Sequence, residues 1–204
     1  MKEDLLIIFI KNPIKGSVKT RLAADLGDDV ALEVYKKLIE ITFQAIEPVE
    51  GDKWVLYSDF IEASFDSPDG NIVTGVQQDG DLGQRMLQAF ARGFSAGYQH
   101  ICIIGSDCYN IRPEIIQEAF RRLLSYDFIL GPSTDGGYYL LGMNSLFEDV
   151  FINKRWSTSN VLRTTLQNIR KNSYTYYLLE ELTDIDTKAD LELLKIDLKT
   201  FLKS

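Results

Sequence analysis

A basic loop near the start of the chain has residues that could bind phosphate. The stretch FIKNPIKGSVKTRLA, residues 9–23, sets four cationic side chains among Gly, Pro, Ser and Thr residues. It follows a hydrophobic run and leads into a predicted helix at about Thr20. Such a loop presents backbone N–H groups and cations to an anion, most simply a phosphate. It is not a Walker A loop, because two residues separate Gly16 from Lys19, and a surface turn with solvated lysines is the alternative interpretation.

A carboxylate follows another hydrophobic run. The stretch IIGSDCYN, residues 103–110, carries Asp107 directly after a predicted strand. A carboxylate at a strand terminus can bind Mg²⁺ or Mn²⁺ together with phosphate oxygens. Aspartate is also common in turns and at helix N-caps, which is the alternative reading of this residue.

A glycine-rich segment surrounds a second aspartate. In LGPSTDGGYYLLG, residues 130–142, Gly131, Gly136 and Gly137 lie around Asp135. Glycines allow a close backbone approach or a positive φ, as a loop that contacts a ligand requires. Asp-Gly also favours a tight hairpin, so a purely structural turn is the alternative.

A second acidic loop precedes a predicted helix near the carboxyl terminus. In LTDIDTKADL, residues 182–191, Asp184 and Asp186 stand two residues apart. Thr187 followed by Asp190 has the pattern of a helix N-cap with an acidic third helical residue. That cap explains part of the acidic cluster but not the two carboxylates before it.

Short apolar runs alternate with amphipathic segments of helical length, and these elements must position the polar loops. The predicted strands are residues 5–10, 54–57, 72–76, 101–104 and 128–130, with a further strand over 138–141. The predicted helices are residues 30–46, 82–94 and 115–124. This alternation indicates an α/β fold with a parallel sheet. We expect the loops that start at Lys11, Gly105 and Gly131 to meet at the carboxyl edge of that sheet.

Composition and charge restrict the class of protein. The chain has 204 residues, 45% hydrophobic, and a formal charge of −8, which argues against a nucleic-acid or anionic-membrane surface. We expect one domain over residues 1–204, with the part after Asn144 as a C-terminal extension. No run is long enough to span a membrane and the amino terminus lacks a signal-peptide pattern, so a cytoplasmic location is expected. Cys102 and Cys108 are expected to be reduced thiols.

Six segments together resemble one family. KNPIKGSVKTRLA, QQDGDLGQRM, GSDC, GPSTDGGYYLLG, WSTSNVL and DIDTKADL occur in the order found in the bacterial GT-A-type, nucleotide-diphospho-sugar-transferase-like proteins sometimes called selenodomain-associated transferases. The resemblance covers nearly the whole chain. It implies a single-domain GT-A fold, with three α/β/α layers around a mostly parallel sheet. It also implies a nucleotide-using transferase with Mg²⁺ or Mn²⁺ as cofactor and a small-molecule acceptor.

The resemblance also assigns roles to individual residues. It implies that the nucleotide phosphates face Lys11, Gly16, Lys19 and Arg21, and that the metal ligands are Asp107, Asp186 and Asp184. It places the base or ribose beside Gln78, Gly80 and Arg85, and the transferred group or acceptor beside Asp135, Gly136, Gly137 and Trp156. The expected catalytic side chains are Lys19, Arg21, Asp107 and Asp135. Tyr109 and Asn110 stand where relatives often carry Pro, and Trp156 could instead be a core aromatic.

Three functions fit these residues. The first is a metal-dependent glycosyltransferase that uses a nucleotide sugar. The second is a nucleotidylyltransferase that joins an NTP to a phosphorylated acceptor and releases pyrophosphate. The third is a non-catalytic nucleotide-binding module. We favour glycosyl transfer on the family resemblance, helped by Trp156, Tyr176 and Tyr177, which could form an aromatic surface for a sugar, although core packing is expected for at least two of them.

Overall fold

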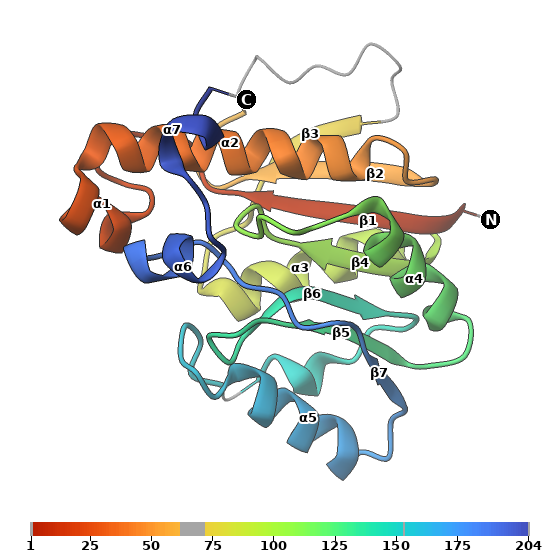
Figure 1. Cartoon of the computed structure of the whole chain (residues 1–204). Coiled ribbons are helices and arrows are strands. Elements are labelled where there is room, and N and C mark those ends of the chain that lie inside the picture. Colours follow the sequence, from red (N-terminus) through yellow and green to blue (C-terminus); the bar gives the residue numbers. More distant parts are fainter. Residues whose placement is uncertain (1, 62–71, 153, 204) are drawn as a thin grey trace.

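The computed structural model of this chain describes residues 2–61, 72–152 and 154–203. Within them, a 7-stranded sheet has the order β3-β2-β1-β4-β6-β5-β7 (Figure 1). Its strands are β1 (Lys2–Ile10), β2 (Asp52–Tyr57), β3 (Ile72–Val76), β4 (Tyr98–Ile104), β5 (Phe128–Pro132), β6 (Tyr138–Met143) and β7 (Tyr176–Leu178). Strands β1 to β6 correspond to the strands predicted from the sequence. The sequence did not predict β7, which is short and half-buried.

The sheet is mostly parallel, as the family resemblance implied. β1 pairs in parallel with β2 and β4, and β5 pairs in parallel with β7. β6 is antiparallel to both β4 and β5, so β5 runs in the same direction as β1 and β4. The loops after β1, β4 and β5 therefore leave the same edge of the sheet, as predicted. One boundary differs, because β5 extends through Gly131 to Pro132 and its loop begins at Ser133.

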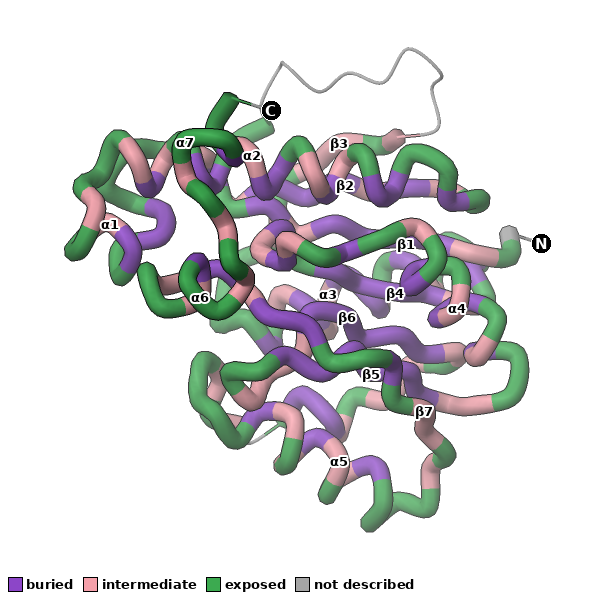
Figure 2. Tube along the Cα trace, in the orientation of Figure 1, coloured by how far each residue is buried: buried purple, intermediate pink, exposed green. Residues whose placement is uncertain are grey.

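Helices cover both faces of the sheet. The helices are α1 (Thr20–Leu26), α2 (Asp28–Ile46), α3 (Leu82–Ser95), α4 (Pro113–Leu123), α5 (Val161–Lys171), α6 (Lys188–Leu193) and α7 (Leu198–Phe201), with a 3₁₀ turn η2 over Glu148–Val150. Alternate β1 side chains point to opposite faces, as they must in a strand. Leu6 and Ile8 pack in the cluster that contains residues of α2 and α4, whereas Leu5 and Ile7 pack with residues of α3 and α5. The central strands are accordingly buried along most of their length (Figure 2).

The carboxyl-terminal segment is more than an extension, because it completes the sheet and one edge of the molecule. β7 adds an edge strand beside β5, and α6 and α7 lie next to α1 and α2 (Figure 1). A separate hydrophobic cluster joins these helices through residues such as Leu22, Leu38, Leu191 and Phe201. This packing fixes the acidic loop before α6 close to the basic loop after β1. None of the described helices is both long enough and apolar enough to cross a membrane.

Candidate functional site

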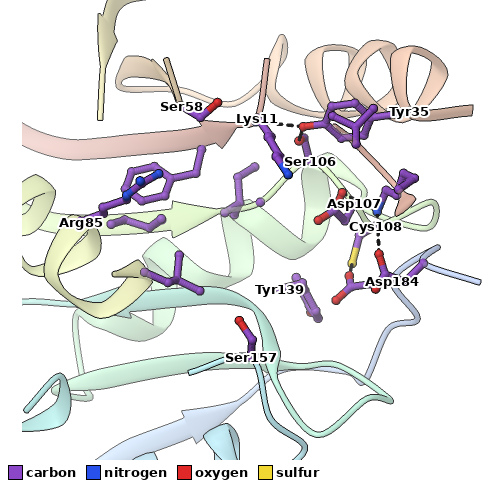
Figure 3. Close-up of a pocket in the computed structure, with 18 of the residues that line it drawn as sticks. Lys11, Tyr35, Ser58, Arg85, Ser106, Asp107, Cys108, Tyr139, Ser157 and Asp184 are labelled. Atoms are coloured by element: carbon purple, nitrogen blue, oxygen red, sulfur yellow. Dashed lines mark hydrogen bonds and ion pairs between the residues drawn. The ribbon is translucent and has the colours of Figure 1, made fainter. Parts of the chain in front are cut away.

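A cavity of about 700 Å³ lies where β1 and β4 end (Figure 3). Of the residues predicted from the sequence, it is lined by Lys11, Lys19, Arg21, Arg85, Asp107, Asp184 and Asp186. The predicted residues outside its lining are Gly16, Gln78, Gly80, Asp135, Gly136, Gly137 and Trp156. The basic loop and both acidic loops thus open into one space, while Asp135, Gly136 and Gly137 lie outside its lining.

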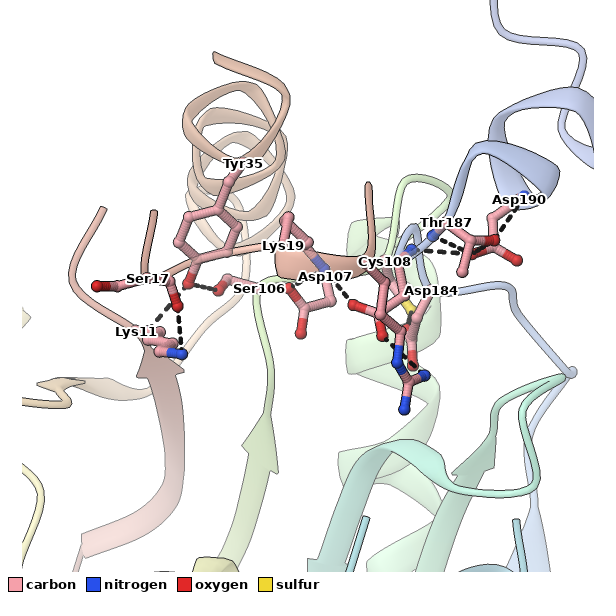
Figure 4. Close-up of polar contacts among 12 residues, drawn as sticks. Lys11, Ser17, Lys19, Tyr35, Ser106, Asp107, Cys108, Asp184, Thr187 and Asp190 are labelled. Carbon is pink, nitrogen blue, oxygen red and sulfur yellow. Dashed lines mark hydrogen bonds and ion pairs between the residues drawn. The ribbon is translucent and has the colours of Figure 1, made fainter. Parts of the chain in front are cut away.

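Lys19 joins the basic loop to both acidic loops (Figure 4). Its Nζ lies 2.6 Å from Oδ1 of Asp107 and 3.5 Å from Oδ1 of Asp186. The Lys19 side chain is only 4% exposed, whereas each carboxylate remains 48% exposed toward solvent. Arg21 approaches Asp186 from outside, with 3.4 Å between Nη1 and Oδ2. Two cations and two carboxylates therefore meet on one wall of the cavity.

The backbone holds Lys19 in a conformation that few lysines adopt. Lys19 is the N-cap residue of α1 and has φ 48° and ψ 43°, in the left-handed region. Burial alone would lower the pKa of its ammonium group, but the carboxylates of Asp107, Asp186 and Asp184 together more than offset this effect and raise the pKa above its usual range. The ammonium group is therefore charged in the folded protein.

The hydrogen-bond partner of the Asp184 carboxylate is Cys108 rather than Lys19. The Cys108 thiol donates to Oδ1 of Asp184 over 2.7 Å, and the two residues also form an isolated antiparallel bridge. Burial raises the pKa of Asp184 to about 6, against the opposing effect of this hydrogen bond. Burial and the neighbouring Asp184 raise the pKa of the Cys108 thiol well above its usual range, so this cysteine is a poor nucleophile. Both cysteines are free, as predicted.

The acidic loops provide ligands for an ion but do not form a complete protein cage. Among the described residues, no group of three or more His, Cys, Asp or Glu side chains is arranged to hold an ion. Asp107 and Asp186 nevertheless share one cation, the ammonium group of Lys19. Mg²⁺ is commonly held by one or two carboxylates together with substrate phosphates, and this donor set fits that mode.

Tyr35 is a part of the site that sequence reasoning missed. It projects from α2, and its hydroxyl accepts a hydrogen bond from the Lys11 backbone N–H over 2.9 Å and shares one with Ser106 over 3.0 Å. Its ring also lies 5.7 Å from Nζ of Lys19. One side chain thus links the loops that follow β1 and β4. The sequence shows Tyr35 only as an apolar position on a helix face, and the pattern gives no sign of the hydroxyl contacts.

The far end of the cavity is built by α3 and the end of β2. Arg85 donates from Nε to the Gly80 carbonyl over 2.9 Å and lies 3.4 Å from the Gln77 side-chain oxygen. Gln77, rather than the predicted Gln78, lines the cavity. Asn12, 1% exposed, fixes the turn at residues 58–60 through contacts with Ser58, Asp59 and Phe60. Ser58 and Asp59 also line the cavity, and the sequence analysis named neither of them.

Comparisons with known proteins support the family that the six motifs resemble. The chain matches DUF2064, described as an uncharacterized protein family conserved in bacteria, over residues 42–158. The chain belongs to the DUF2064 family. It is also similar to the crystal structure of a proposed nucleotide-diphospho-sugar transferase from Desulfovibrio desulfuricans G20. The two chains are 30% identical with a TM-score of 0.88, over 100% of this chain and 95% of the other. The family expected from the sequence is confirmed.

More distant structures show that this DUF2064 chain has the GT-A-like fold. A cytidylyltransferase from Leptospira borgpetersenii is 15% identical with a TM-score of 0.59, over 100% of this chain and 93% of the other. Rv0371c from Mycobacterium tuberculosis H37Rv, in complex with manganese, is 12% identical with a TM-score of 0.50, over 95% of this chain and 98% of the other. No curated protein matched this chain.

In this DUF2064 member, the segment around Asp135 forms a closed turn. Asp135 Oδ1 accepts hydrogen bonds from the Ser133 hydroxyl over 2.5 Å and from the Gly137 N–H over 2.8 Å. Gly136 has φ 88°, and its carbonyl accepts from the Leu162 N–H over 3.0 Å. A Cβ on Gly136 would lie 2.2 Å from the Ser159 carbonyl oxygen. These contacts favour the turn interpretation for this segment, while a role beside the acceptor stays a prediction.

We expect Gly136→Ala to lower the free energy of unfolding by about 2 kcal/mol, because it combines a left-handed φ with a backbone clash. Gly97 has φ 92° with no atom within 4 Å of a built Cβ. Gly97→Ala is therefore the matched control, and φ strain alone should cost it about 1 kcal/mol. Urea unfolding of both variants measures the difference. Equal losses would show that the close approach to Ser159 is relaxed at no cost.

Trp156 packs against the first turn of α3. A Cβ on Gly83 would lie 2.2 Å from the Trp156 indole nitrogen, and the Phe151 ring is 6.3 Å away. These contacts favour the core interpretation over an acceptor platform. The adjacent Ser157 does line the cavity. Tyr176 and Tyr177 lie on the edge strand β7, away from the cavity lining, so the proposed aromatic surface for a sugar does not form.

Lys154 gives a pH-dependent prediction for the same loop. Its ammonium group contacts the Thr165 hydroxyl and lies 5.1 Å from the Trp156 ring, and burial lowers its pKa to about 8. The unfolded chain therefore binds more protons than the folded one between about pH 8 and 10.5, so this group opposes folding at neutral pH. We expect Lys154→Met to raise the free energy of unfolding at pH 7 by about 1 kcal/mol, after allowance for solvent screening. This advantage should shrink as the pH rises above about 8 and should be lost above 10.5, as denaturant unfolding across pH can check.

Proposed function

We propose that this protein is a metal-dependent glycosyltransferase that uses a nucleotide-diphospho-sugar donor. One observation carries the proposal: Lys19, Arg21, Asp107 and Asp186 meet on the wall of a single cavity at the carboxyl edge of the sheet. Ligands of open α/β sheets bind at this edge. Cations there suit a diphosphate, and the carboxylates suit the divalent ion that accompanies it.

The cationic side chains offset the charge of the leaving diphosphate. Lys11, Lys19 and Arg21 all line the cavity, and the Lys11 Nζ donates to the Ser17 carbonyl over 2.5 Å. Transfer leaves negative charge on the nucleoside diphosphate, and fixed cations beside it lower the barrier. Gly16 has φ 77°, which shapes the loop that carries these side chains. No covalent intermediate is needed in this mechanism.

Asp107 and Asp186, with Asp184, would hold the divalent ion. When bound, Mg²⁺ or Mn²⁺ supplies a positive charge on the diphosphate. Asp107 lies in the loop that follows β4, and Ile185 anchors the other loop by donating its N–H to the Asp107 carbonyl over 3.0 Å. The two carboxylate loops are therefore held together by the backbone before any ligand arrives. This preorganisation supports a shared metal.

We propose that the base or ribose and the acceptor lie at opposite ends of the cavity. Gln78, Gly80 and Arg85 are the residues that we propose beside the base or ribose, and Arg85 lines the cavity at that end. We assign the transferred group or acceptor to the side of Asp135, Gly136, Gly137 and Trp156, the last of which is followed by the cavity-lining Ser157. Ser157 and Tyr139 line the cavity on this side, so the acceptor reaches the donor past them.

Nucleotidyl transfer is the second candidate, and the similar cytidylyltransferase structure favours it. It would use the same loops, but the nucleophile would attack the α-phosphorus of an NTP and pyrophosphate would leave. We prefer glycosyl transfer because the structure that is 30% identical is a proposed nucleotide-diphospho-sugar transferase, whereas the cytidylyltransferase is 15% identical. The two acidic loops oppose a purely nucleotide-binding role, since the basic loop alone could serve binding.

The leaving group distinguishes the two reactions. The purified protein is incubated with Mg²⁺ or Mn²⁺, a panel of nucleotide sugars and NTPs, and a metabolite extract that supplies acceptors. Nucleoside diphosphate and pyrophosphate are assayed separately. The proposal predicts nucleoside diphosphate from a nucleotide sugar, only with the metal present. Pyrophosphate from an NTP instead would establish nucleotidyl transfer.

A further inference from the structure

We propose that Lys19 makes the site selective for a divalent ion that arrives with a nucleotide. In the free protein its ammonium group occupies the cation position between Asp107 and Asp186, and nucleotide phosphates draw it away. This inference rests on the metal site of the proposed function, but it concerns the order and coupling of binding rather than the reaction. Lys19 then competes with the free ion for the two carboxylates, in addition to binding phosphate.

The geometry shows a built position rather than a chance contact. The Lys19 Nζ is within 4 Å of both carboxylates, at 2.6 Å from Asp107 and 3.5 Å from Asp186. The left-handed backbone at Lys19, with φ 48°, turns the chain so that the side chain enters the protein. The Tyr35 ring, 5.7 Å from Nζ, covers the ammonium group. The side chain is therefore held in place on several sides.

A free divalent ion must compete with this ammonium group. If the ion took Asp107 and Asp186, it would leave a nearly buried Lys19 cation without its partners, and an unpaired buried charge is strongly unfavourable. Phosphate oxygens of a nucleotide in the cavity would give Lys19 a new partner through charge-assisted hydrogen bonds. The carboxylates would then be released for the ion. By linkage, nucleotide and ion must raise each other's affinity by the same factor.

The test measures Mn²⁺ binding to the intact protein, and the electron paramagnetic resonance signal of free Mn²⁺ is the readout. Titrations are run with and without a nucleoside diphosphate, and a titration lacking protein corrects for ion bound to the nucleotide. Lys19→Met keeps the length of the side chain and removes its charge, and Lys19→Gln is a second neutral variant. Lys15→Met is the matched control, since Lys15 pairs with exposed Asp29 over 2.6 Å. Circular dichroism confirms folding of each variant.

Without nucleotide, the Lys19 variants should bind Mn²⁺ at least about tenfold more tightly than the wild type. Lys15→Met should match the wild type. The nucleotide should increase Mn²⁺ affinity clearly in the wild type and much less in the Lys19 variants. Equal or weaker Mn²⁺ binding by both Lys19 variants would overturn the inference while leaving the metal site intact. Failure of every form to bind Mn²⁺, even with nucleotide, would overturn the metal site of the proposed function as well.

Discussion

Asp107→Asn should reduce the rate of transfer by about 10²–10³-fold at saturating donor. The substitution removes the carboxylate that lies 2.6 Å from Lys19 and that we propose as a ligand of the divalent ion. The amide is nearly the same size, so the loop after β4 should keep its shape. Removing charge stabilisation at the leaving group acts on the chemical step, and the loss should therefore fall on kcat.

Nucleotide binding separates this effect from general damage. In the presence of a chelator, nucleotide affinity of Asp107→Asn should equal or exceed that of the wild type, because Lys19 loses its strongest partner. Asp25→Asn removes an exposed carboxylate of α1 outside the cavity lining and should leave kcat unchanged. Steady-state kinetics and calorimetry measure both quantities. Activity of Asp107→Asn within a few fold of the wild type would remove this carboxylate from the mechanism.

Lys19→Ala should weaken binding of a nucleoside diphosphate, measured without a divalent ion, by roughly 10- to 150-fold. This range corresponds to about 1.5–3 kcal/mol, the contribution of a hydrogen bond to a charged group. The buried ammonium group lies on the cavity wall beside the proposed metal ligands, so its phosphate contact would be shielded from solvent. Isothermal titration calorimetry with a nucleoside diphosphate and a chelator measures the change.

Lys15→Ala is the control for the charge of the loop. The Lys15 side chain is 56% exposed and pairs with Asp29, which is itself exposed, so this change should alter affinity by less than about twofold. Thermal unfolding shows whether Lys19→Ala keeps the fold. A folded Lys19→Ala protein with wild-type affinity would place the phosphates away from the basic loop.

Most of the fold follows from hydrophobic periodicity, and the exceptions have physical reasons. Strands such as β1 and β4 are continuous apolar runs because helices cover both of their faces. β7 contains three residues and is only partly buried, so its sequence lacks the pattern of a core strand. The reversal of β6 depends on the tight turn around Gly136, and an apolar run alone does not reveal strand direction.

The sequence predicts the charged side chains of the site better than the contacts that hold their loops in position. The loops that carry Lys19 and Asp107 were expected at one edge because parallel strands end together there, whereas only the family resemblance joined Asp186 to them. Tyr35 was missed, since its hydroxyl contacts join segments that are far apart in the sequence. The pairing of Cys108 with Asp184 also depends on tertiary structure, over 76 positions of the chain.

The central claim is that a divalent ion and nucleotide phosphates meet between the basic loop and Asp107. A crystal soaked with Mn²⁺ and a nucleoside diphosphate tests it directly by anomalous scattering. The account predicts an anomalous peak about 2 Å from a carboxylate oxygen of Asp107, with phosphate oxygens completing the coordination and Lys19 turned toward them. Phosphates bound elsewhere, or no anomalous peak within coordination distance of Asp107, would contradict it.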